Sequence, residues 1–86
     1  MTACACGHGQ ARVPATREEA LELAGHANAI GPLLEVVQRD NARWLSVLRC
    51  RECGAYWAED SISSGHADLF FVYPVETGEL PEPLNL

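Results

Sequence analysis

The spacing of apolar side chains predicts one amphipathic helix near the N-terminus. Between residues 20 and 30 they recur at intervals of three and four, as on one face of a helix. Thr16 and Glu19 have the spacing of a capping box, so the helix should begin after Thr16. Gly31 and Pro32 should end it, because glycine suits the position after a helix and proline cannot continue the hydrogen-bond ladder.

Beyond this helix the apolar runs shorten to the length of strands. Residues 33–38 also fit a helical face, but two adjacent valines and the preceding helix breaker favour a strand. Residues 39–42 have the composition of a turn and should join this strand to the next as a hairpin. The polar segment 60–67 should be a loop, and Pro74 should end the last strand. We therefore expect strands at residues 33–38, 43–49, 55–59 and 68–73.

These elements predict an α+β fold in which one N-terminal helix packs on a small antiparallel sheet of three to four strands. Residues 1–75 should form this single domain, because 86 residues are too few for two. Such a chain buries only about 60–65% of its unfolded surface, so its core alone leaves stability marginal. Residues 76–86 are acidic, contain prolines and lack basic residues, and should form a loosely attached tail.

The charge balance narrows the classes of partner that this domain should bind. The chain has 12 carboxylates, six arginines and no lysine, which gives a formal net charge of −6. This excess argues against nucleic acid and anionic membranes, because both require a basic surface. No apolar run approaches the ~20 residues of a membrane span. We also find no signal-peptide pattern at the N-terminus, so we expect a cytoplasmic location.

The cysteines supply the clearest chemical signal. All four lie in two short clusters, Cys4-Ala5-Cys6-Gly7 and Cys50-Arg51-Glu52-Cys53-Gly54. The second cluster has the form of a zinc knuckle, in which the final glycine permits the positive φ that the turn requires. Four thiolates make a tetrahedral zinc site, which would staple the fold. The predicted ligands of a structural Zn²⁺ ion are Cys4, Cys6, Cys50 and Cys53.

Other interpretations of the cysteines remain open from the sequence alone. His8 follows the first cluster closely and is an alternative ligand in place of Cys4 or Cys6. Iron also binds four cysteines, normally in two C-x2-C clusters. Disulfides are less expected in a cytosolic chain, and no βαβ pattern surrounds Cys50-x-x-Cys53 to indicate a thioredoxin-like redox pair. Because four protein ligands leave no position for a substrate water and no G-x-S-x-G elbow occurs, we expect no enzymatic activity.

A protein-binding surface is expected around the second cysteine cluster. Tyr56 and Trp57 are neighbours on a predicted strand, so they point to opposite faces and at least one should lie away from the main core. Glu59 and Asp60 follow them, and His66 lies in a loop rich in serine and glycine. We list these five residues as candidate partner contacts, with a core or simply solvated position as the alternative for each.

The run Trp44-x3-Leu48-x-Cys50-x2-Cys53-Gly54-x2-Trp57 is followed by a Ser-Gly-His loop and a short apolar strand. In this run the segment 43–72 resembles small bacterial toxin-immunity proteins. In those families the loop histidine precedes a run of glycines, whereas here His66 precedes Ala67 and Asp68.

The resemblance implies a zinc-binding protein, not an enzyme, that binds and blocks a toxin domain. The acidic balance would suit a basic toxin domain. The alternative functions are a zinc-ribbon accessory or regulatory protein in a nucleic-acid machine, and a thiol redox or metal sensor.

Overall fold

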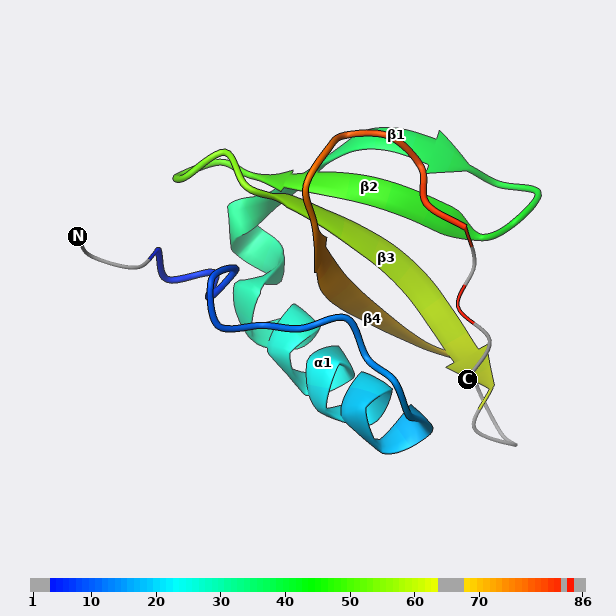
Figure 1. Cartoon of the computed structure of the whole chain (residues 1–86). Helices are drawn as coiled ribbons and strands as arrows, with labels where there is room; N and C mark the ends of the chain where they lie inside the picture. The colour runs from blue at the N-terminus through cyan, green and yellow to red at the C-terminus, as the bar shows by residue number, and fades with distance from the viewer. Residues whose placement is uncertain (1–3, 64–67, 83, 85–86) are drawn as a thin grey trace.

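The computed structural model describes residues 4–63, 68–82 and 84. They form one helix, a short 3-10 turn and a four-stranded antiparallel sheet in the order β1-β2-β3-β4 (Figure 1). This arrangement confirms the predicted α+β fold class. In the part of the chain that is described, no helix is long and apolar enough to cross a membrane. The elements are α1 (Arg17–Ile30), the 3-10 turn η1 (Gly31–Leu33), β1 (Leu34–Asp40), β2 (Leu45–Cys50), β3 (Tyr56–Ser63) and β4 (Asp68–Val75).

The ends of α1 follow from local sequence. The hydroxyl of Thr16 accepts a hydrogen bond of 3.2 Å from the backbone N–H of Glu19, which confirms the predicted N-cap. The Glu19 carboxylate accepts from the backbone N–H of Ala15 at 3.4 Å, one residue before the group that a capping box would use. At the other end Gly31 keeps a right-handed conformation, with φ −46°, and leads directly into η1.

The sheet extends further than the sequence predicted. β3 continues to Ser63, so the predicted loop is wrong for residues 60–63, because Ile62 packs into the core there. β4 continues through Pro74, which pairs in register with Trp57. An edge strand tolerates proline because the missing N–H need not meet a neighbouring strand. The first hairpin is also shifted, since β1 ends only at Asp40.

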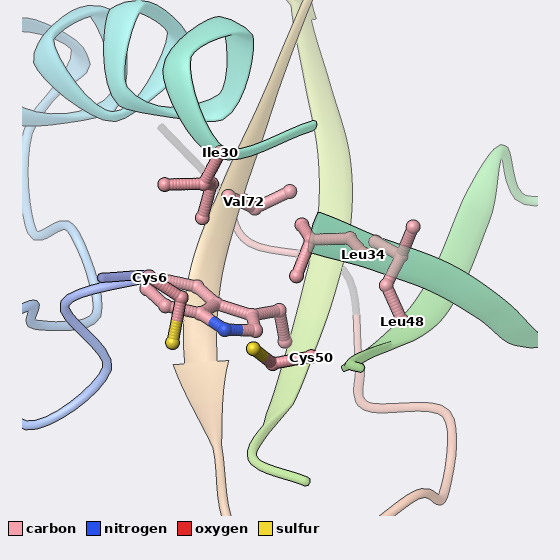
Figure 2. Close-up of a cluster of buried hydrophobic side chains, with 7 residues drawn as sticks. Cys6, Ile30, Leu34, Leu48, Cys50 and Val72 are labelled. Carbon is pink, nitrogen blue, oxygen red and sulfur yellow. The ribbon is translucent and has the colours of Figure 1, made fainter. Parts of the chain in front are cut away.

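Two clusters of buried side chains hold the helix against the sheet. Figure 2 shows the first, in which Cys6 from the N-terminal segment and Cys50 from β2 lie beside Ile30 and Val72. α1 packs along β4, so its side chains contribute to both clusters. The members of the first are Cys6, Ile30, Leu34, Leu48, Cys50, Trp57 and Val72. The members of the second are Ala20, Ala58, Ile62, Phe71 and Tyr73.

The C-terminal segment returns to the sheet. In Figure 1 the chain after β4, coloured orange to red, turns back toward the strands. The backbone N–H of Leu84 donates a 3.1 Å hydrogen bond to the carboxylate of Asp60, and Leu84 packs against the second cluster. Asp60 is only 7% exposed and also accepts from the backbone N–H of Ser61. Residue 84 is therefore anchored, where the sequence predicted a loosely attached tail.

Replacing Asp60 with alanine should release this segment. The variant leaves the part-buried backbone N–H groups of Ser61 and Leu84 without this acceptor, which costs about 1 kcal/mol in the free energy of unfolding. Urea denaturation measures that loss, and limited proteolysis should cut residues 76–86 faster than in the parent. Asp68 is exposed, so Asp68→Ala serves as the control. An Asp60→Ala protein with unchanged stability and proteolysis would contradict the anchor.

Candidate metal centre

Each cysteine cluster is shaped by a local turn that ends in glycine. The N–H of Gly7 donates to the carbonyl of Cys4 at 3.0 Å, and Gly7 has φ 75°. The N–H of Gly54 donates to the carbonyl of Cys50 at 2.9 Å, and Gly54 has φ 78°. The positive φ predicted for the second turn is confirmed, and the first cluster uses the same device. Both turns thus present two sulfurs on one side of the backbone.

The fold brings the two turns together. The four Sγ atoms of Cys4, Cys6, Cys50 and Cys53 all lie within 4.8 Å of one another. Two pairs that are distant in sequence, Cys4 with Cys50 and Cys6 with Cys53, are each separated by 3.6 Å. A tetrahedral zinc site with Zn–S bonds of ~2.3 Å has S···S edges of roughly 3.8 Å, so these separations fit the ion. They are far longer than the ~2.05 Å of a disulfide, and the cysteines are free.

The thiols of this cluster differ in their tendency to ionise. Burial, reinforced by the neighbouring thiols, raises the pKa of Cys6 to about 12. Burial acts on Cys50 too, but hydrogen bonds from the backbone of Cys53 and Glu52 outweigh it and lower the pKa of Cys50 to about 7. Ionisation is thus favoured at Cys50 and opposed at Cys6. Zinc binds thiolates, so its binding would have to displace the proton of Cys6.

Two histidines lie beside the cysteine cluster, but neither belongs to the metal-binding group. The ring of His8 lies 3.2 Å from the carbonyl oxygen of Val75 and packs edge-on against Trp57. The ring of His26 lies 2.6 Å from the carbonyl oxygen of Cys6, so α1 holds the first cysteine turn directly. Among the described residues the metal-binding group consists of the four cysteines alone. This geometry therefore does not favour His8 as a ligand in place of Cys4 or Cys6.

His26 is a supporting residue that the sequence pattern did not single out. Its ring lies close to Gly7, where an added Cβ would be 3.4 Å from it. Trp57 supports the same region and is fully buried. Its indole N–H has no hydrogen-bond partner among the described residues. Trp57 belongs to the first buried cluster, which also contains Cys6 and Cys50. Thiolates accept hydrogen bonds better than neutral thiols, so ionised cysteines would suit this indole N–H better.

The candidate partner residues fall in different environments. Trp57 is fully buried and Asp60 nearly so, and therefore neither offers a surface to a partner. Tyr56 and Glu59 are half-buried. His66 lies outside the described residues.

Glu59 should make the stability of the protein depend on pH. Burial raises the pKa of this carboxyl above its ordinary value of 4.5, although the charge of Arg39 lowers it. The folded state thus binds more protons than the unfolded state, and stability should fall as pH rises from about 4.5 through the raised pKa.

Replacing Glu59 with glutamine should abolish this loss at neutral pH. The gain over the parent should stay under about 1 kcal/mol, because the half-exposed carboxylate is partly solvated. The difference between the two proteins should shrink as pH falls toward 4.5. Thermal melts from pH 4 to pH 8 measure the effect, and a pH-independent difference would contradict the assignment.

No protein-family model, curated protein or solved structure matches this chain. The resemblance to toxin-immunity proteins therefore stays a prediction that rests on the residues that carry it.

Proposed function

We propose that this chain is a protein-binding domain whose fold is held together by one structural zinc ion. The observation that carries the zinc part of the proposal is the spacing of four thiols, supplied in pairs by the N-terminal segment and by the end of β2 with the turn after it. Four protein ligands complete the coordination of zinc and leave no position for a reacting water. The ion thus acts on folding and not on a substrate, and no enzymatic activity is proposed.

A protein partner is favoured over nucleic acid because of charge. The chain carries a net charge of −6 without a single lysine, so its field attracts basic proteins and repels phosphates. Blocking a basic toxin domain is the specific form of this proposal, supported by the Trp44-to-Trp57 run and by the acidic balance. Such a complex should weaken as salt rises, since screening acts on exposed charges.

Co-expression with the protein encoded beside this chain tests the proposal. If that neighbour contains a toxic domain, this chain should restore growth and co-purify with it, with less complex retained at high salt. A gel-shift assay with DNA and RNA at ~50 mM salt is the opposing test, because low salt favours any phosphate affinity. A shift at that salt together with no protein complex would favour the nucleic-acid alternative and overturn the proposal.

A further inference from the structure

A groove of about 410 Å³ lies at the end of the sheet away from the cysteines. It combines aromatic and charged side chains from all four strands and the first hairpin. We call it the Trp44 groove, and the residues used below are Arg39, Trp44, Ser46, Glu59 and Phe70.

The sheet register places the polar members in one row. Ser46 of β2 pairs with Arg39 of β1 on one side and with Glu59 of β3 on the other. Cross-strand partners share a face of the sheet, so these three side chains lie next to one another. Phe70 of β4 pairs with Ser61, two residues beyond Glu59, and therefore faces the same way. The carboxylate thus has an exposed aromatic ring on the neighbouring strand.

Trp44 is held in an unusual position at the rim of the groove. Its φ is 58°, the left-handed region that bulky residues rarely adopt, and it is the only non-glycine residue there in the described ranges. Its side chain is 67% exposed, so no core packing repays the strain. Phe70 is 44% exposed in the same groove. Residues in strained backbone conformations cluster at ligand-binding positions, so this exposed ring in the hairpin turn is a candidate contact.

Glu59 lies half-buried in this groove without a hydrogen-bond partner among the described residues. Arg39 acts on it through charge, but the Nε of Arg39 donates to the hydroxyl of Ser46 at 3.4 Å. Asp40, the other carboxylate of the groove, is already paired with Arg43 at 2.7 Å. Glu59 is therefore the carboxylate available to a cation from outside.

We propose that the Trp44 groove receives an arginine side chain from a protein partner, stacked on Trp44 or Phe70 and paired with Glu59. A planar guanidinium suits both contacts, since it stacks on aromatic rings and binds a carboxylate in two-point fashion. The net charge of −6 favours a basic partner, and Arg39 opposes it locally. This inference rests on the proposed function and names the surface where the partner docks.

Titration with a capped hexa-arginine peptide tests the groove, with hexa-lysine and hexa-glutamate for comparison. The chain has two tryptophans, one exposed and one buried, so two indole N–H signals in a ¹⁵N spectrum report on different sites. Hexa-arginine should shift the Trp44 signal and leave that of Trp57 in place. Hexa-lysine should bind less tightly, and hexa-glutamate should not bind.

Three variants test which side chains of the groove contact the peptide. Trp44→Asn keeps a residue that tolerates positive φ but removes the ring, and Glu59→Gln removes the charge. Each should weaken hexa-arginine binding by roughly 2- to 30-fold. Arg39→Gln should tighten it by up to about fivefold, because it removes a like charge. All three variants should keep the parent's indole signal of Trp57, which shows that they fold.

Glu22→Gln is the matched control, since it removes one exposed carboxylate on α1, away from the groove. Equal weakening by Glu22→Gln and Glu59→Gln would reveal diffuse charge attraction and overturn the proposal. Binding of hexa-glutamate that Arg39→Gln abolishes would overturn it in favour of an acidic partner. If the complex with the full protein partner survives Trp44→Asn and Glu59→Gln, the Trp44 groove is not the docking site. The proposed function would still stand.

Discussion

Removing the proposed zinc ion should unfold most of this protein, and replacing Cys50 with alanine should do the same. The four thiols join segments 46 and 47 residues apart, and two of the sulfurs belong to the first buried cluster. The binding free energy of a structural zinc is folding free energy, on the order of 10 kcal/mol. Domains are stable by only about 5–15 kcal/mol in total, so the loss should be decisive.

Elemental analysis and melting curves decide this prediction. The untagged protein should contain one zinc per chain, and circular dichroism should show loss of the cooperative transition after treatment with a strong chelator. Arg51→Ser is the matched control for Cys50→Ala: it changes an exposed side chain in the same turn and keeps all four ligands. A metal-free protein with four titratable thiols and an unchanged melting curve would contradict the zinc site.

Replacing Trp57 with alanine should be the most damaging change outside the cysteines. Trp57 is completely buried in the first cluster, and the rings of His8 and His26 lie 5.2 and 5.8 Å from its own. The variant leaves a cavity beside the turn that carries Cys6, and such substitutions cost about 3–5 kcal/mol. Urea unfolding of the zinc-loaded protein measures the loss directly.

The second tryptophan supplies the control. Trp44 is 67% exposed, so Trp44→Ala should change the free energy of unfolding by no more than about 0.5 kcal/mol. Equal losses in the two variants would contradict the assignment of Trp57 to the core. The Trp57→Ala protein should also release zinc at lower chelator concentration than the parent, because the ring supports both histidines that flank the site.

The features that the sequence determined by itself are local. The Thr16 cap, the end of α1 at Ile30 and the glycine of the second cysteine turn each depend on a few neighbouring residues. The grouping of the four cysteines was also predictable, because thiols paired at short spacing are typical of a metal site. What the sequence could not supply was which sulfurs lie closest, Cys4 to Cys50 and Cys6 to Cys53, because that depends on how the two turns meet in the fold.

Tertiary structure decided the rest, because burial and strand neighbours are set by contacts between distant segments. Pro74 stays in a strand since β4 lies at the edge of the sheet, a position that no local pattern reveals. Asp60 looked like a surface carboxylate, yet it is buried as the acceptor for the N–H of Leu84. Between the two tryptophans, only the packing of the N-terminal segment and α1 against the sheet decides that Trp57 is enclosed and Trp44 exposed.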